Sequence, residues 1–339
     1  MHKMANLEYA FMVQELAPRV VGRHFSRIRK VAEGIYRIKI GDSEILCQAG
    51  IRLHETRYIE KSEQTDKFAE KISKELDNAK LISLGQINND RIIEFTFDRG
   101  RLIFEMFGDG NIVLVRDGIT VCAYRYESWS DRNIKAGSSY APPKPSVTEQ
   151  LEVSDRFIIV SLMKMPFGKD YAAEALSHLG IDEKTPGNQL APDQINRIEV
   201  ELRKIRDGAK PVVFYQGGKP VDFALVDLAR YSKLEKREFA SLGDAADEYY
   251  ANMEQPNPEV EKLMRRLEKQ KEHLQELLEE EKANRSQGDY IYAHYVEIER
   301  ILGLAAAGKF EEIEKIPNQK IKVIKIDKKE KSVEVELPD

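Results

Sequence analysis

The sequence predicts an α+β protein that begins with an antiparallel β-sandwich and ends with a long charged helix and a small hairpin domain. Three observations carry this prediction. Apolar and polar residues alternate over three consecutive segments in 86–115, separated by glycine-containing turns. A stretch rich in Gly, Ser and Pro at 137–148 is followed by helical periodicity. Leucines then recur at heptad spacing between Val260 and Leu277.

Residues 1–145 are expected to form the first domain, a β-sandwich decorated with helices. Apolar residues at helical spacing in 5–17 end at Pro18, and Asp66 is placed to cap a helix over 66–78. Alternation with period two predicts strands between these helices and again after the second one, since successive strand side chains point to opposite faces. These strands fall within the ranges 27–50, 92–97, 102–107, 112–115 and 119–126.

Four further segments are expected after this domain. Residues 150–210 are helical in pattern, with Gly180 suited to end one helix and Pro192 to begin another. Residues 211–257 read as a β-hairpin around Gly217-Gly218 and a short helix, which would complete the N-terminal body. Residues 258–287 follow as a charged helical arm, and 288–339 as the start of a small domain with helices and a hairpin.

The arm is predicted to be a coiled coil because its apolar positions step alternately by three and four residues. A single amphipathic helix lying on the body is the alternative. Two copies of the chain could pair through a coiled coil, and a helix without a return partner suggests the front part of a longer protein. The positions of the seam are Val260, Leu263, Leu267, Gln270, Leu274 and Leu277.

A basic segment stands out against a net charge of −5. Residues 19–39 contain seven Arg and Lys side chains but only one acidic residue, Glu33. Such an excess suits contact with nucleic-acid phosphates, and a solvated basic face is the alternative. The candidate phosphate contacts are Arg23, Arg27, Arg29 and Lys30.

The sequence offers no signature of a self-sufficient enzyme. It lacks a glycine-rich phosphate loop and a nucleophile elbow, and its six histidines show no metal-ligand spacing. We therefore expect no catalytic residue, metal or cofactor. Cys47 and Cys122 are expected to be buried, reduced thiols. No apolar run is long enough to span a membrane, and the first residues do not read as a signal peptide, so a cytoplasmic protein is expected.

Two features of the 86–115 stretch invite a functional hypothesis. Asp90-Arg91 stands where a strand begins, and Glu105 lies within an apolar run, where a carboxylate is costly unless it is paired. An ion pair or a turn would explain Asp90-Arg91 structurally. Alternatively, the planar fork of Arg91 could grip a phosphate or base while Asp90 orients it or accepts from a base amine.

The combination of these segments resembles the NFACT family, whose members include the bacterial RqcH proteins and the eukaryotic nuclear export mediator factor. Older descriptions call such proteins fibronectin-binding-like. The resemblance runs in order over almost the whole chain and suggests an archaeal member. It rests on VGRHFSRI, NNDRIIEF, EMFGDGNIVLV, EALSHLGIDEKTPGNQL and the heptad helix.

The resemblance implies both a fold and a function. The fold would be an N-terminal domain like that of formamidopyrimidine-type DNA glycosylases, a helix–two-turn–helix-like module at 150–210, and a coiled-coil arm bearing a middle domain, without the C-terminal RNA-binding domain. The function would be ribosome quality control. The protein would bind the large ribosomal subunit carrying stalled peptidyl-tRNA and recruit tRNA for template-free C-terminal tailing, while the ribosome catalyses peptide transfer.

By position, the family's Asp-Arg pair matches Asp90-Arg91, and its Glu-x-x-Gly segment matches Glu105 and Gly108; both are implied to serve tRNA binding. One family element departs, because residues 71–74 read Lys-Ile-Ser-Lys where Leu-Arg-Lys is common. Two rival functions remain as alternatives: a DNA-binding or DNA-repair protein of glycosylase-like fold without catalysis, and a fibronectin-binding adhesin. The chain lacks the N-terminal proline nucleophile and zinc-finger cysteines of the former, and no export signal supports the latter.

Overall fold

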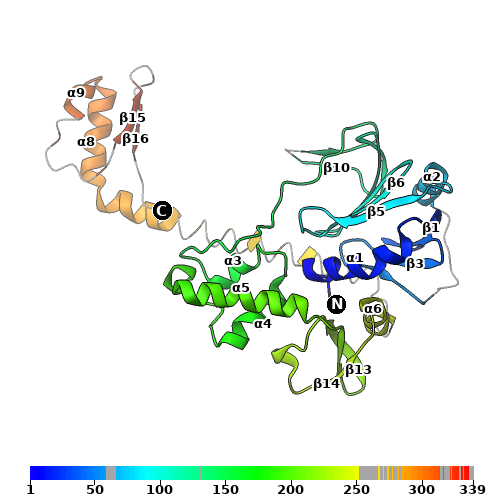
Figure 1. Ribbon diagram of the computed structural model, residues 1–339. Helices are drawn as coiled ribbons and strands as arrows, with labels where there is room; N and C mark the ends of the chain where they lie inside the picture. Colours follow the sequence, from blue (N-terminus) through cyan, green and yellow to red (C-terminus); the bar gives the residue numbers. More distant parts are fainter. Residues whose placement is uncertain are drawn as a thin grey trace. The chain divides into compact units, whose positions relative to one another are not determined.

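The computed structural model divides the chain into two compact units, residues 1–254 and 255–339, which are treated separately here (Figure 1). The structure describes residues 1–58, 66–129, 132–251, 266–267, 270, 273–274, 277, 281, 284–313, 316, 321, 323–327, 330 and 332–335.

The first sheet has four antiparallel strands in chain order, joined by tight turns at which Gly34 and Gly41 adopt positive φ. Alternate residues of its two middle strands are buried in the main core: Tyr36, Ile38 and Ile40 on one, Ile45 and Cys47 on the next. The segments are α1 (Asn6–Val20), β1 (Phe25–Ala32), β2 (Ile35–Ile40), β3 (Ser43–Gln48) and β4 (Arg52–Glu55). The predicted first helix and the strands after it are therefore confirmed, although the helix continues through Pro18.

The second sheet has five antiparallel strands, also in chain order. The helix α2 precedes it and begins after Asp66, which caps the helix by accepting a hydrogen bond from the Phe68 amide at 2.8 Å. The three-strand pattern predicted within 86–115 is confirmed. The segments are α2 (Lys67–Glu75), β5 (Leu81–Gln86), β6 (Ile92–Phe97), β7 (Gly100–Glu105), β8 (Asn111–Arg116) and β9 (Ile119–Ala123), followed by the short pair β10 (Glu127–Ser128) and β11 (Asn133–Ile134).

Both faces of the second sheet are covered. Ile93 and Phe95 join the large core shared with the first sheet, where Phe25 and Phe97 meet edge to face at 5.8 Å. Ile92 belongs to a second, smaller core on the opposite face, closed by the chain that follows β9. Figure 1 shows β10 on the side of this sheet away from α1. The sheets thus form a mixed α/β body built from antiparallel strands.

Two glycine turns bring the sheets into backbone contact. Gly50, between β3 and β4, and Gly110, between β7 and β8, both have φ of +71°. A Cβ built on Gly110 would lie 2.0 Å from the Gly50 amide nitrogen, closer than any side chain can approach. Glycine is therefore required here for packing as well as for φ.

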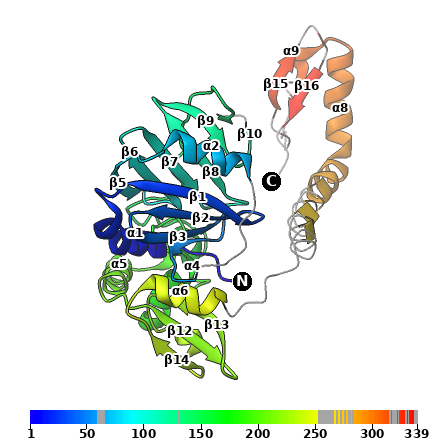
Figure 2. The same cartoon turned by 90° about the vertical axis from the view of Figure 1, so that its right-hand side faces the viewer.

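The rest of the first unit follows the predicted order of a helical module, a hairpin and a short helix (Figure 2). Gly180 ends one helix in the left-handed conformation and Pro192 begins the next, as predicted. A third hairpin strand, 235–238, was not expected because its four residues are all exposed and carry no apolar alternation. The segments are α3 (Ile158–Leu162), α4 (Lys169–Leu179), α5 (Pro192–Asp207), β12 (Val212–Gln216), β13 (Lys219–Ala224), β14 (Glu235–Glu238) and α6 (Leu242–Ala251).

The second unit has a small core of its own, formed by Ile301, Ala305, Ile313 and Ile321. Its segments are α8 (Tyr295–Ala306), α9 (Phe310–Ile313), β15 (Val323–Asp327) and β16 (Ser332–Val335), so the predicted C-terminal hairpin is confirmed. Of the predicted coiled-coil seam, Val260 and Leu263 lie outside the described residues, and the described members are helical. No helix in the described part of the chain could span a membrane.

Candidate nucleic-acid interface

Asp90 closes the turn between β5 and β6. Asn88 and Asn89 enter the left-handed region with φ of 54° and 53°, which asparagine tolerates better than most residues. The Asp90 carboxylate accepts from the Arg91 amide at 2.7 Å and from the Ser146 hydroxyl at 2.6 Å, and Asn6 of α1 donates at 3.4 Å. The buried Asp90 therefore joins the turn to α1 and to the segment after the sheet.

The Arg91 side chain is not paired with Asp90. Its Nε is buried without a hydrogen-bond partner, and no ion pair to its guanidinium exists within the described residues. The Arg91 backbone is fixed at both ends, since its amide donates to Asp90 and its carbonyl accepts from the Met106 amide at 2.7 Å. The half-buried Arg91 side chain therefore has no carboxylate partner within the described residues, although its Nε is itself enclosed by the protein.

Glu105 is 1% exposed, and the sequence alone did not identify the residue that pairs with it. Arg132 donates to both carboxylate oxygens, at 2.5 and 2.9 Å, and the Tyr140 hydroxyl donates at 2.9 Å. Glu105 lies opposite Ile92 on β6, so it faces the smaller core, whereas the alternation of the strand directs Arg91 to the other face. The structure therefore brings these residues to one end of the sheet but on opposite faces.

Gly108 lies in the turn that packs on Gly50. Its φ is +58°, and a Cβ there would meet nothing within 4 Å. The neighbouring Asp109 pairs with Arg125 at 3.3 Å, which links this turn to the chain after β9. Gly108 serves the turn's backbone conformation and leaves open space beside it.

The basic segment forms one face of the first sheet. The register sets Arg27 opposite Lys39 and Arg29 opposite Arg37. Arg37 is buried, whereas Arg29 is exposed and Arg27 and Lys39 are half-buried, so these last three are the cations of this face within reach of an anion. Glu44 of β3 provides part of the compensation, at 3.9 Å from Arg27 and at 3.5 Å from both Arg37 and Lys39.

The other two candidate phosphate contacts do not join this basic face, defined as Arg27, Arg29, Arg37 and Lys39. Lys30 alternates to the opposite side and pairs with Glu33 at 2.6 Å. Arg23 is exposed beside Gly41, before β1 begins. Arg37 and Lys39 lie on the face because β2 returns antiparallel to β1, and local sequence does not reveal the register of this pairing.

The helix α6 covers the far end of the same face, over β3 and β4. The Arg52 guanidinium lies 4.0 Å from the centre of the Tyr250 ring, and His54 stacks on that ring at 6.0 Å. Burial, aided by the charge of Arg52, lowers the pKa of His54 to about 3, so this histidine is neutral. His54 is a packing residue, and α6 limits the basic face to β1 and β2.

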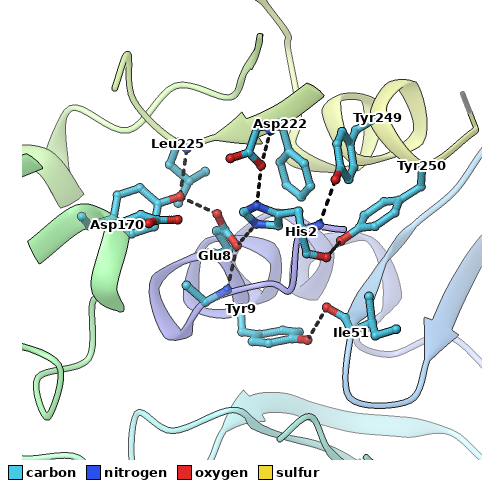
Figure 3. A network of polar contacts seen from close by, with 12 residues as sticks. His2, Glu8, Tyr9, Ile51, Asp170, Asp222, Leu225, Tyr249 and Tyr250 are labelled. Atoms are coloured by element: carbon cyan, nitrogen blue, oxygen red, sulfur yellow. Dashed lines mark hydrogen bonds and ion pairs between the residues drawn. The ribbon is translucent and has the colours of Figure 1, made fainter. Parts of the chain in front are cut away.

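A buried charge network that the sequence did not indicate lies around His2 (Figure 3). The imidazole contacts Glu8 of α1 through Nε2 at 2.9 Å and Asp222 of β13 through Nδ1 at 2.7 Å. Burial alone would lower the pKa of His2, but the charge of Glu8 and the hydrogen bonds to both carboxylates outweigh it and raise the pKa to about 10. His2 is therefore an imidazolium that fastens α1 to the hairpin.

The same network extends into the helical module. Tyr171 of α4 donates to Glu8 at 2.6 Å and accepts from the Leu225 amide at 3.0 Å. The backbone of His2 bonds to Tyr249 and Tyr250 of α6 at 2.8 and 3.0 Å. This largely buried network therefore ties α1 to the helical module, the hairpin and α6.

The described residues contain no cluster of His, Cys, Asp and Glu able to hold a metal ion. Cys47 and Cys122 are free and buried, as expected, and burial raises the pKa of both thiols, that of Cys122 to about 11.

Residues 7–303 match the family model described as NFACT N-terminal and middle domains. The chain belongs to this family. Among curated NFACT relatives, the archaeal Rqc2 homolog aRqcH of Methanocaldococcus jannaschii is 31% identical over 72% of this chain and 41% of its own length. The ribosome quality control complex subunit NEMF of Homo sapiens is 23% identical over 74% of this chain and 28% of its own length. The chain thus spans less than half the length of either relative.

Solved structures show the same NFACT fold. The fibrinogen binding protein from Staphylococcus aureus covers 73% of this chain with 98% of its own, at a TM-score of 0.58 and 18% identity. The N-terminal part of the fibronectin/fibrinogen-binding protein from Streptococcus suis covers 74% with 100% of its own, at a TM-score of 0.57 and 22% identity. At these identities the likeness shows the fold alone.

Proposed function

We propose that this NFACT protein is a ribosome quality-control factor that binds the large ribosomal subunit carrying stalled peptidyl-tRNA and recruits tRNA for template-free C-terminal tailing. The observation that carries the proposal is family membership over residues 7–303, together with relatives named as ribosome quality-control proteins. Peptide transfer would be the work of the ribosome, so the chain acts by positioning tRNA. It works in the cytoplasm, without a cofactor.

Two surfaces of the first unit support a role in RNA binding. Arg91 is half-buried and has no carboxylate partner within the described residues, and the planar fork of an arginine suits a phosphate or a base edge. On β1 and β2 the partly exposed Arg27 and Lys39 share the single carboxylate of Glu44, and RNA phosphates would supply further negative charge to this face. In this proposal Asp90 and Gly108 shape the turns beside the ligand, and Glu105 acts from within the protein.

The finer architecture belongs to the same proposal. The first unit would be a relative of the formamidopyrimidine-type glycosylases that has kept a nucleic-acid surface without catalysis. Its helix–two-turn–helix-like module would span 150–210, and the body would be completed by 211–257. The arm at 258–287 would form a coiled coil that reaches the ribosome or pairs with a second copy, and a middle domain would begin at 288.

Replacement of Arg91 by alanine is expected to weaken tRNA binding by about 10- to 150-fold, the range for losing hydrogen bonds to a charged group. Co-sedimentation with large ribosomal subunits should persist, because the arm would still engage them. A filter-binding titration with purified tRNA measures the first effect and a sucrose cushion the second. Arg99→Ala, in the turn between β6 and β7, is the matched control. Equal tRNA affinity for Arg91→Ala and the unaltered chain would refute the assignment.

Binding of tRNA is expected to weaken steeply with salt, since each neutralised phosphate releases counterions. Replacing Arg27 and Arg29 by glutamine should reduce the slope of log K against log salt by about 1 to 2. Lys30→Gln serves as the control because Lys30 lies off the basic face and pairs with Glu33. The comparison is a titration at four potassium chloride concentrations. An unchanged slope in the double variant would place the phosphates elsewhere.

A further inference from the structure

The hairpin after β9 exposes two aromatic side chains beside arginines. Trp129, the single tryptophan of the chain, is 43% exposed, and Tyr126 is 59% exposed. Both residues flank β10, and this strand lies on the side of the second sheet away from α1 (Figure 1). Unpaired RNA bases stack on exposed aromatic rings of this kind, and neighbouring arginines strengthen such contacts.

Trp129 is supported from within the protein. The guanidinium of Arg132 lies 4.3 Å from the centre of the indole ring, within the range of a cation–π contact. The Arg132 side chain is only 8% exposed and is fixed by its two hydrogen bonds to Glu105. Glu105 is held in turn by the hydroxyl of Tyr140. The buried Glu105 carboxylate therefore fixes the orientation of the Arg132 guanidinium. The guanidinium in turn packs on the half-exposed indole ring of Trp129.

We propose that Trp129 is a stacking platform for an unpaired nucleobase of the bound RNA, with Arg132 and Glu105 as positioning residues. The inference rests on the proposed function and extends it from phosphate contact to a base contact. A braced indole loses little freedom when a base stacks on it, and stacking does not depend on which base is present. The neighbouring Tyr126 offers a second exposed ring, and Arg125 adds a positive charge beside it. A peptide partner would instead be expected to bind in a groove lined by aliphatic side chains.

Because Trp129 is the single tryptophan, its fluorescence reports directly on this surface. Two probes are titrated into the 339-residue chain: purified deacylated tRNA and a ten-nucleotide single-stranded RNA. A blunt RNA duplex of equal charge is the comparison, since its bases are not available for stacking. Both tRNA and single-stranded RNA are expected to quench the indole emission in step with binding, and the duplex is expected to leave it unchanged.

Variants at Trp129 supply the second measurement, made by filter binding. Trp129→Ala is expected to weaken binding of single-stranded RNA and tRNA about 5- to 150-fold, the range for one stacked base, with duplex affinity unchanged. Trp129→Phe keeps a ring and is expected to stay within about threefold of the unaltered chain. Arg132→Met should fall between the two and broaden the indole emission spectrum even without RNA.

The outcomes separate this inference from the proposed function. Binding of tRNA without quenching, together with equal affinity for Trp129→Ala, overturns the stacking platform and leaves tRNA recruitment standing; the exposed indole would then serve a protein contact. Quenching by single-stranded RNA without any affinity for tRNA supports the platform and refutes tRNA recruitment. Absence of binding to either probe overturns both.

Discussion

Replacement of His2 by alanine is expected to cost about 3–5 kcal/mol of unfolding free energy, the range for breaking a buried ion pair from one side. His2 lies between Glu8 and Asp222, whose side chains are 1% and 10% exposed, and supplies the positive charge that both carboxylates share. Asp222 retains Arg230 at 3.0 Å, but Glu8 would keep only neutral donors. Its charge would then remain buried without compensation.

Urea unfolding followed by Trp129 fluorescence measures this loss, because the indole lies in the same unit as His2. His24→Ala is the matched control, since His24 is exposed and its removal should change stability by no more than about 0.5 kcal/mol. A midpoint for His2→Ala equal to that of the unaltered chain would show that the network contributes nothing to folding.

The pH dependence of stability gives an independent check on His2. The pKa of His2 is raised from 6.5 in the unfolded chain to about 10 in the folded protein. Its contribution is therefore complete below pH 6.5 and is lost as pH rises toward about 10, with a slope of at most about 1.4 kcal/mol per pH unit. The difference in unfolding free energy between the unaltered chain and His2→Gln should shrink between pH 7 and pH 9.5. A constant difference would contradict a charged His2.

The order of elements could be predicted from sequence because each one depends on local chemistry. Each local feature depends on only a few consecutive residues. The structure confirms three of them: the strand alternation from Ile92 to Phe97, the helix cap at Asp66 and the helix end at Gly180. The strand 235–238 was missed for the converse reason: its backbone pairs with β12, while its side chains remain in solvent and leave no pattern.

The candidate interface was only partly predictable because its decisive contacts join residues far apart in sequence. The cost of burying Glu105 implied a partner, but nothing in the local sequence pointed to Arg132, 27 residues away. His2 and Asp222, separated by 220 residues, are a more extreme case. The basic segment was visible as composition, yet only the register of β1 and β2 shows which of its charges share a face. Pairing across the fold, rather than residue type, decides which groups remain for a ligand.

Replacement of Glu105 by methionine is the second large expected effect, again about 3–5 kcal/mol, because the buried Arg132 guanidinium would lose both hydrogen bonds to the Glu105 carboxylate. The double variant Glu105→Met/Arg132→Met removes both charges and fills similar volume, so it should recover to within about 2 kcal/mol of the unaltered chain. Urea unfolding of the four members of this double-mutant cycle measures the coupling. A double variant that is as unstable as the sum of the single ones would show that the pair is not coupled.

The same cycle decides how Glu105 serves RNA. If Glu105 works through Arg132, then Glu105→Met and Arg132→Met should each weaken binding of single-stranded RNA, and combining them should add nothing further. If Glu105 instead contacts RNA directly, the two losses should add, and Arg132→Met alone should leave a measurable dependence on Glu105. The burial of Glu105 favours the first outcome, because a carboxylate whose two oxygens already accept three hydrogen bonds from Arg132 and Tyr140 has no surface left for a phosphate or a base.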